Sequence, residues 1–482
     1  MSVLSSSSDV LPGGPPATRR IAAGAKPRFS ERRRAALISC AVFLVHAFSP
    51  ALTSADSRWT VMVALSIIDR HTTNLDPYIR LIKEKQYLSV ECAGPSGELL
   101  GPQIRDCAQG HLYNLYPVGT PLMAAPFVWA MRSLLAALAL LLGRQISLHH
   151  PVLDAFFHAD LVNAYPLVES VIASVFVALT AQVLFFTARR HVDARSAAAM
   201  ALIFAFATSA WSTASRALFQ HGPSMLLIAT VLYLLVSSED NPQLAGLAGL
   251  PVAFAYVVRP TNALLVAVIT AYVLVRHTRQ FLLYALCALP VAVGFIAYNV
   301  SAFGRMLPYY YSQRPPLPHS TAEVATVLKV MAGQLISPSR GLLIFTPIAA
   351  FSIVGMFRSW RSGWTPLSKW LIALVILHWI TISMFVSSWW GGHSYGPRLF
   401  SDMAPVLVLF LTPLFQQWQD QGGWNWRPSQ CAFVALLAIS VFMHGQGGLN
   451  IRAHMWNITP ADVDQRPARV WDWKDPQFLR GL

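Results

Sequence analysis

The segment "TSADSRWT", residues 53–60, places an aspartate directly after the first long apolar run of the chain. Asp56 is therefore expected within about one helical turn of a membrane surface. The apolar stretch that follows, 59–68, is too short to span a membrane and predicts an interfacial helix. Asp56 could cap that helix, because Asp is among the favoured N-cap residues. It could also be a general base held at the lipid–water boundary, and one residue can do both.

Two further polar features belong to the same region. The stretch "HLYNLYPVGTP", residues 111–121, enters the next apolar segment through an irregular, proline-containing sequence. Irregular backbone at membrane depth is tolerated mainly where it is buried in protein or lines a cavity. We therefore expect Tyr116 to line a cavity and contact substrate; a plain helix-entry turn is the alternative. Asp76, which closes the polar part after the interfacial helix, is a second candidate for substrate contact.

The elements that must position these residues are membrane helices. Of the 482 residues, 55% are hydrophobic and 12% are charged, whereas soluble domains carry about 25% charged residues. Long apolar runs recur, and a run of about 20 residues crosses a bilayer core. The fold class is therefore predicted to be an all-α polytopic membrane protein. Eleven spans are predicted, at approximately 35–52, 164–188, 197–217, 222–238, 243–258, 262–276, 281–299, 340–357, 369–388, 401–417 and 430–446.

The net charge of +14 is spread over the chain rather than gathered in one patch. This distribution is typical of the positive-inside rule and does not favour a nucleic-acid partner. Residues 1–34, with seven basic and two acidic side chains, resemble a disordered cytosolic tail. The segments assigned to the same cytosolic face are 188–195, 237–243, 275–280, 357–364 and 416–427.

A twelfth apolar stretch, 117–143, is expected to be interrupted by Pro121 and Pro126. Eleven crossings keep the arginine-rich loops inside only if this stretch starts and ends outside, as a re-entrant or interfacial segment. The membrane domain is then 35–446, with the C-terminal tail 447–482 outside. The remaining outer segments are the first loop 53–116, 216–224, 257–262, the second long loop 301–339, and 387–400.

Two of the five cysteines, Cys92 and Cys107, lie together in the first outer loop with fourteen residues between them. That separation suits a disulfide in an oxidising compartment, although the spacing does not decide whether they pair.

Several motifs follow one another in an order that carries more information than any one of them. They are the early Asp56 in a large first loop, "YPVGTP", "RALFQHGPS", "RPTN", "YNVSAFGRMLPYYY", "SPSRGLLIFTP" and "SYGPRLFSDMAP". Over roughly 35–446 this order resembles the GT-C superfamily of membrane glycosyltransferases. It most resembles the bacterial branch related to protein O-mannosyltransferases and lipid A aminoarabinose transferases.

The resemblance implies an enzyme of the bacterial inner membrane that uses a polyprenyl-phosphate-linked sugar and inverts the anomeric carbon. It implies reaction on the extracytoplasmic face, with a catalytic carboxylate at the position of Asp56. Many relatives carry two adjacent acids there, whereas Ser57 follows Asp56 in this chain. That departure leaves the base less certain and weakens the case for a metal held by paired acids.

In such a reaction the lipid phosphate gains charge as it leaves, so fixed cations should stabilise the transition state. Arginine suits this task because its planar fork meets phosphate bidentately. Arg259 and Arg398 stand beside prolines at the mouths of spans, and Arg340 lies in "SPSRG". Any of them could instead snorkel toward lipid headgroups. The candidates for the donor phosphate are Arg58, Arg259, Arg340 and Arg398.

Histidines and aromatic residues complete the candidate site. His221 and His393 are substrate-contact candidates, although a lone histidine is more often a hydrogen-bonded structural residue. No cofactor is certain; if a divalent metal binds, Asp56 and these two histidines are its first candidates, and its identity is unknown. Tyr309 and Tyr395 could contact a sugar, whereas aromatic residues at span ends more often form an interfacial belt.

The leading functional hypothesis is a glycosyltransferase whose acceptor is a lipid, a glycan or a protein outside the membrane. The main alternative is a transporter or flippase of a lipid-linked saccharide, and a third is a non-catalytic assembly partner of the same fold. A transporter would favour ionisable residues deep inside the spans. The middle regions of the predicted spans are nearly free of Asp, Glu and Lys, which favours chemistry at the outer surface.

Overall fold

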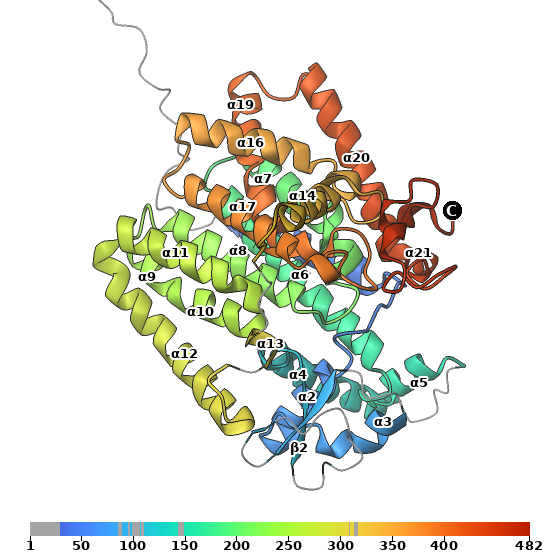
Figure 1. Ribbon diagram of the computed structural model, residues 1–482. Helices are drawn as coiled ribbons and strands as arrows, with labels where there is room; N and C mark the ends of the chain where they lie inside the picture. The colour runs from blue at the N-terminus through green and yellow to red at the C-terminus, as the bar shows by residue number, and fades with distance from the viewer. Residues whose placement is uncertain are drawn as a thin grey trace, which may run out of the picture.

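The computed structural model describes residues 29–84, 89–94, 97–98, 107, 110–142, 149–307, 309–312 and 317–482, and these are mostly helical (Figure 1). Five helical segments in this part of the chain are long and apolar enough to cross a membrane. They confirm a helical membrane protein, while the count of eleven crossings stays a prediction. The five segments are Gly119–Leu141, Tyr165–Ala188, Thr278–Phe303, Arg398–Asp420 and Pro428–Leu449.

The elements follow one another along the chain with few strands. The described strands, β1 (Val90–Ala93) and β2 (His111–Asn114), pair antiparallel. The helices are α1 (Phe29–Ala47), α2 (Thr60–Arg70), α3 (Ile79–Glu84), α4 (Gly119–Leu142), α5 (Pro151–Phe157), α6 (Tyr165–Ala188), α7 (Ala194–Phe206), α8 (His221–Ser237), α9 (Gln243–Leu247), α10 (Gly249–Val258), α11 (Ala263–Arg276), α12 (Phe281–Phe303), α13 (Tyr309–Ser312), α14 (Thr321–Ile336), α15 (Leu342–Phe345), α16 (Ala349–Ser362), α17 (Ser368–Met384), the 3-10 helix η7 (Arg398–Met403), α18 (Ala404–Leu409), α19 (Thr412–Asp420), α20 (Pro428–Leu449) and α21 (Ile451–Met455).

The first helix starts earlier than expected. Helix α1 begins at Phe29, so residues 29–34 are helical and do not belong to a disordered tail. Glu31 in its first turn pairs with Arg189 at 2.6 Å, which ties this end of the helix to the end of α6. Residues 1–28 of the predicted tail lie outside the described residues.

The predicted interruption of the stretch 117–143 is wrong. Helix α4 is continuous over 24 residues and contains Pro126 in its interior. Pro121 is its third residue, where the backbone N–H would have no partner within the helix. Pro126 removes one intrahelical hydrogen bond, which the helix tolerates here. The segment is therefore long enough to span a membrane.

Helix α2 forms where the sequence predicts an interfacial helix, but it is covered by protein. Residues Thr60 through Ser66 are all buried, and α2 packs against α4 and α6. In Figure 1, α2, α3, β2, α4 and α5 gather into one group at the lower edge of the molecule. The apolar residues of α2 therefore stabilise this group rather than facing lipid.

The segments assigned to the cytosolic face do lie together. Polar contacts join the C-terminal end of α6 to α1, to the loop after α8 and to α19. Helix α8 runs from this group to the segment 216–224, which the sequence assigns to the outer face. Its 17 residues span about 25 Å. The joining pairs are Arg189–Glu31, Arg190–Asp240, Asp193–Gln419, Arg358–Gln417, Trp364–Gln416 and Ser238–His277.

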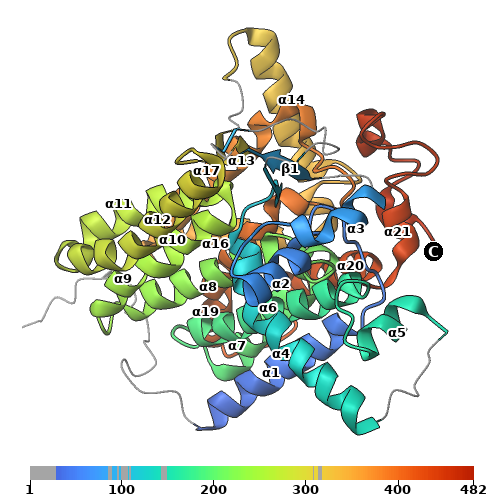
Figure 2. The same ribbon diagram turned by 90° about the horizontal axis from the view of Figure 1, so that it is seen from below.

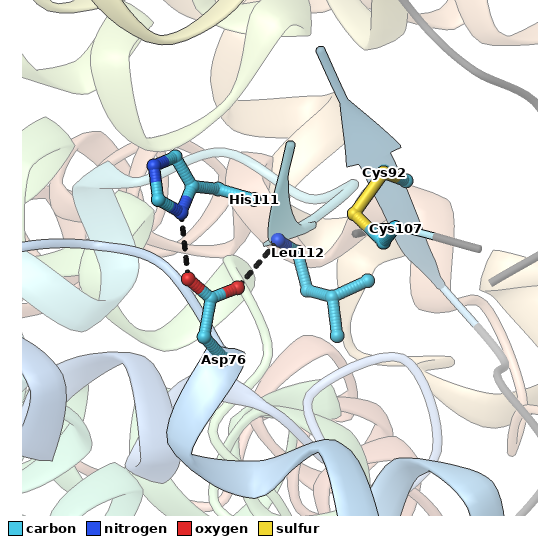
Figure 3. The surroundings of a disulfide bond; sticks show 5 residues. All are labelled: Asp76, Cys92, Cys107, His111 and Leu112. Atoms are coloured by element: carbon cyan, nitrogen blue, oxygen red, sulfur yellow. Dashed lines mark hydrogen bonds and ion pairs between the residues drawn. A yellow bond between two sulfur atoms is a disulfide. The ribbon is translucent and has the colours of Figure 1, made fainter. Parts of the chain in front are cut away.

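The first outer loop is fixed by one disulfide and one carboxylate, drawn in Figure 3. Cys92 and Cys107 are bonded, which confirms the pairing that the sequence left open. Asp76 accepts hydrogen bonds from His111 Nδ1 at 2.7 Å and from the backbone N–H of Leu112 at 2.8 Å. Asp76 therefore secures β2, and it does not line the cavity described below.

The second long loop and the tail are also structured. The segment 301–339 contains α14, which projects from the body of the molecule in Figure 2. The C-terminal tail folds back toward α20 and α21 at the edge of the molecule (Figure 1).

Candidate active site

Four of the predicted site residues line one cavity, which is partly open and measures about 360 Å³ with the adjoining solvent space included. They are Asp56, Tyr116, Arg259 and Arg398, and they come from four segments that are far apart in the sequence. The other residues that line it are Ser57, Thr60, Pro117, Thr120, Leu218, Phe219, Gln220 and Tyr310.

Asp56 lies in the turn between α1 and α2 and forms an ion pair with Arg398. The N-cap of α2 is Trp59, so the helix-cap interpretation of Asp56 is wrong. The carboxylate points to the cavity instead, and 36% of the side chain is exposed there. Asp56 and Arg398 are 342 positions apart in the sequence, so their ion pair joins the two ends of the membrane domain.

The charge state of Asp56 is set by its neighbours. Burial acts to raise the pKa of Asp56, but the positive charge and hydrogen bond of Arg398 outweigh it, aided by a hydrogen bond from Tyr116, and the pKa falls below its usual value. Burial and the nearby Asp56 carboxylate raise the pKa of Tyr116. Asp56 is therefore ionised and Tyr116 is a hydroxyl donor at neutral pH.

Arg398 is held by more than its carboxylate partner. Its guanidinium carbon lies 4.7 Å from the centre of the Phe219 ring, a cation–π contact. Its Nε donates to His221 Nε2 at 3.3 Å. These two contacts hold the guanidinium at the cavity wall and do not involve Asp56.

Arg259 reaches the cavity from the end of α10. Its Nε lies 2.9 Å from Asp402 Oδ2 and donates to Thr261 Oγ1 at 2.8 Å. His221, the first residue of α8, lies 3.2 Å from Arg259 Nη1 and 3.4 Å from Asp402 Oδ1. His221 therefore contacts both arginines from behind the cavity, which fits a structural role.

Two acidic residues of the site were missed by sequence reasoning. Asp402 is fully buried, and its only signal was its place in "SYGPRLFSDMAP", four residues after Arg398 and thus about one turn away along a helix. Glu169 is also fully buried, near the start of a long apolar helix. It accepts hydrogen bonds from Ser54 and Ser57, the residues on either side of Ala55–Asp56. The sequence signal for Glu169 was an isolated acidic residue within an apolar run.

Arg340 does not reach the cavity. It is 3% exposed and donates to the Trp390 carbonyl at 2.6 Å, Asn457 Oδ1 at 2.8 Å and Gln477 Oε1 at 2.7 Å. Its role is to bind the C-terminal tail to the loop that precedes η7, so its predicted contact with a donor phosphate has no geometric support.

The remaining candidates also lie elsewhere. Tyr395 is buried and donates its hydroxyl to the Met443 carbonyl at 2.7 Å. Arg58 interacts with Tyr165 and Glu169 and is not among the described residues that line the cavity. The side chain of Tyr309 lies outside the described residues, whereas its neighbour Tyr310 lines the cavity.

The predicted metal-binding trio is not gathered at one point. His393 lies on the outer loop beside the tail residues Asp462 and Asp464, at 3.0 and 3.5 Å. Among the described residues that line the cavity, Asp56 is the single carboxylate, and two arginines face it. A divalent cation there would meet two fixed positive charges, so this donor set does not fit one.

No protein-family model matches the chain, and neither the curated proteins nor the solved structures give a match. The lining of the cavity combines one ionised carboxylate, two guanidinium groups and two tyrosines at the end of a bundle of apolar helices. Such a set can hold an anion such as a phosphate and accept a proton beside it.

Proposed function

We propose that the protein is a membrane glycosyltransferase of the GT-C type, transferring a sugar from a polyprenyl-phosphate donor to a lipid, glycan or protein acceptor. The observation that carries the proposal is the cavity in which Asp56 faces Arg259 and Arg398. It supplies a base and two phosphate-binding groups within one site, at the end of helices that suit a lipid-linked substrate.

In the proposed reaction the acceptor hydroxyl attacks the anomeric carbon in line with the departing phosphate. A new C–O bond forms to the acceptor while the bond between the anomeric carbon and the phosphate oxygen breaks, and the configuration inverts. Asp56 takes the acceptor proton, and the polyprenyl phosphate leaves with the bonding electron pair. A single base suffices here, whereas glycoside hydrolysis by inversion needs a carboxyl pair across the bond.

The arginines stabilise the charge that develops on the leaving phosphate. Arg259 is held by Asp402 at 2.9 Å, and Arg398 is held by Phe219 and His221. Because both groups are fixed before substrate binds, little reorganisation is needed in the transition state.

The ion pair between Asp56 and Arg398 explains how the base becomes available. A donor phosphate at Arg398 competes with Asp56 for the guanidinium. Once Asp56 loses this partner, burial acts on its carboxylate with less opposition, so its pKa rises toward that of a better base. Donor binding would therefore precede activation of the acceptor.

We place the site on the extracytoplasmic face of a bacterial inner membrane, with the N-terminus cytosolic and eleven crossings. The start of α4 reaches the cavity through Thr120, and the start of α6 reaches its rim through the contact of Glu169 with Ser57. Both ends of the stretch 119–165 thus lie on the side of Asp56, which supports an interfacial α4 along the outer face. Because α4 is one continuous helix, the re-entrant alternative has no geometric support.

The proposal is tested with purified protein in lipid nanodiscs and a radiolabelled polyprenyl-phosphate hexose, with a bacterial membrane extract supplying acceptors. We expect wild-type protein to release polyprenyl phosphate and to label an acceptor, and Asp56→Asn to lower the rate by at least about 100-fold. Asp69→Asn is the matched control, because Asp69 lies in the same loop and pairs with Arg132 away from the cavity.

Two outcomes would contradict the proposal. Equal rates for wild-type protein and Asp56→Asn would remove Asp56 as the base. Movement of the intact lipid-linked sugar across a vesicle membrane, with no cleavage of its phosphate bond, would replace the transferase by a transporter.

A further inference from the structure

Glu169 is a buried carboxylate beneath the cavity, and it has no role in the proposed reaction. It is fully buried in the second turn of α6. A carboxylate in such a place is costly unless it is hydrogen-bonded. Its oxygens accept bonds from Ser54 Oγ at 3.2 Å, Ser57 Oγ at 2.6 Å and the Leu218 backbone N–H at 3.3 Å.

The two serines flank the candidate base. Ser54 donates a hydrogen bond to Glu169 Oε1, and Ser57 donates one to Oε2. The two carboxylate oxygens therefore hold the turn on both sides of Asp56. Each serine hydroxyl is thereby held to the rigid helix α6. The turn cannot rotate as a unit without breaking one of these bonds.

The third bond reaches the other half of the ion pair. Leu218 is the residue before Phe219, whose ring lies under the Arg398 guanidinium at 4.7 Å. One carboxylate thus fixes the backbone that carries Asp56 and the backbone that carries the platform of Arg398. Glu169 itself is not among the described residues that line the cavity.

We infer that Glu169 is the positioning residue of this site: through Ser54, Ser57 and Leu218 it fixes the separation of Asp56 and Arg398 without contacting substrate. The inference rests on the proposed function. Ser57 directly follows Asp56, and its hydroxyl connects the turn to an acid supplied by another helix.

The first test is kinetic. Glu169→Gln keeps the size of the side chain but presents an NH₂ group to partners that are themselves donors. We expect kcat to fall about 10- to 100-fold, because a misplacement of about 1 Å can cost that much. The donor KM should change less than kcat, since Arg259 keeps its own contacts with Asp402 and Thr261. Ser174→Ala is the matched control: Ser174 is a buried residue of the same helix that donates only to the Ser170 carbonyl at 2.7 Å.

The second test measures the position of Asp56 without catalysis. Asp56 is labelled with a water-soluble carbodiimide, and the rate of labelling is followed by mass spectrometry. In Glu169→Gln we expect at least about fivefold faster labelling, because the carboxylate is no longer held against Arg398 and a larger fraction is protonated. Ser57→Ala, a milder change that removes one of the three bonds, should give an intermediate rate.

The outcomes separate this inference from the proposed function. Wild-type kcat and wild-type labelling in both Glu169→Gln and Ser57→Ala would overturn the positioning role. A wild-type protein that transfers no sugar would overturn the transferase, while the labelling rates would still decide whether Glu169 positions Asp56. If Glu169→Gln fails to fold, Ser57→Ala carries the same comparison.

Discussion

At the scale of the residue, Arg398 has partners of two kinds. His221 and Phe219 are fixed parts of the protein and keep the guanidinium at the cavity wall. Asp56 is a partner that a bound phosphate can replace. The ion pair is therefore a structural contact in the free protein and, in the proposed reaction, the point at which donor binding changes the base.

This exchange predicts different pH dependences for kcat/KM and kcat. Activity needs ionised Asp56, so each rate falls as the pH drops through the governing pKa. The pKa of Asp56 is lowered in the free protein, and kcat/KM reports that state, whereas kcat reports the donor complex. We expect the acid limb of kcat at higher pH than that of kcat/KM. If the acid limbs of kcat and kcat/KM coincide, the ion pair between Arg398 and Asp56 persists in the donor complex, which would contradict this prediction.

The two arginines that the sequence could not separate should respond differently to the same change. Arg398→Lys loses the planar fork, so we expect the donor KM to rise about tenfold. Arg340→Lys should leave the donor KM of the folded fraction unchanged and lower the midpoint of thermal unfolding, because the tail loses bonds at Asn457 and Gln477. Donor titration and thermal unfolding of both variants test this. A raised donor KM in Arg340→Lys would bring Arg340 back into the site.

At the scale of the element, the first outer loop depends on covalent and polar ties because it is built mainly from short elements. The disulfide joins β1 to Cys107, and Asp76 holds β2 from the other side (Figure 3). Strand β2 ends at Asn114, two residues before Tyr116. The loop thus determines where one wall of the cavity lies.

Removing the disulfide should destabilise this loop. The bonded cysteines are 15 positions apart, and closing a loop of that size contributes about 3 kcal/mol in the chain-entropy description. We expect the double change Cys92→Ser, Cys107→Ser to lower the melting temperature and expose the loop to limited proteolysis. Cys40→Ser, at an exposed free cysteine, is the control. Reduced wild-type protein should melt like the double variant; a melting point unaffected by reductant would contradict the prediction.

At the scale of the whole molecule, the polar segments separate into two sets. One set joins α1, the end of α6, the loop after α8 and α19 through charged and amide side chains. The other contains the cavity and the C-terminal tail. The predicted topology assigns the first set to the cytosolic side and the second set to the outer side.

Single-cysteine labelling tests that topology. In a background lacking Cys40, Cys287 and Cys431, a membrane-impermeant maleimide should label Ala322→Cys in intact cells. Gln243→Cys should be labelled only after permeabilisation. His149→Cys, just after α4, decides the crossing count.

Labelling of His149→Cys in intact cells means that α4 returns to the outer face, as eleven crossings require. Labelling only after permeabilisation means that α4 spans, and the orientation of every later loop must then be reassigned.

The sequence predicted the helical membrane class and the members of the cavity that stand at span mouths beside prolines or turns, such as Asp56, Arg259 and Arg398. It missed Glu169 and Asp402, because an acid inside an apolar run has no local partner in the sequence. It wrongly predicted Arg340 as a phosphate-binding residue, because the C-terminal tail that buries Arg340 is distant in the sequence. Asn457, one of the tail residues that Arg340 contacts, lies 117 positions away. Local pattern identifies groups that can do chemistry; which of them meet is decided by tertiary packing.

The pairing of Asp56 with Arg398 has a consequence for biogenesis. The two residues are 342 positions apart, so most of the membrane domain must leave the ribosome before they can meet. At about 5–20 residues per second, synthesis of that length takes about 17–70 s. Throughout this time the nascent chain presents a carboxylate without its guanidinium partner. The ion pair is thus completed only by the last third of the chain, and a product truncated before Arg398 lacks one wall of the cavity.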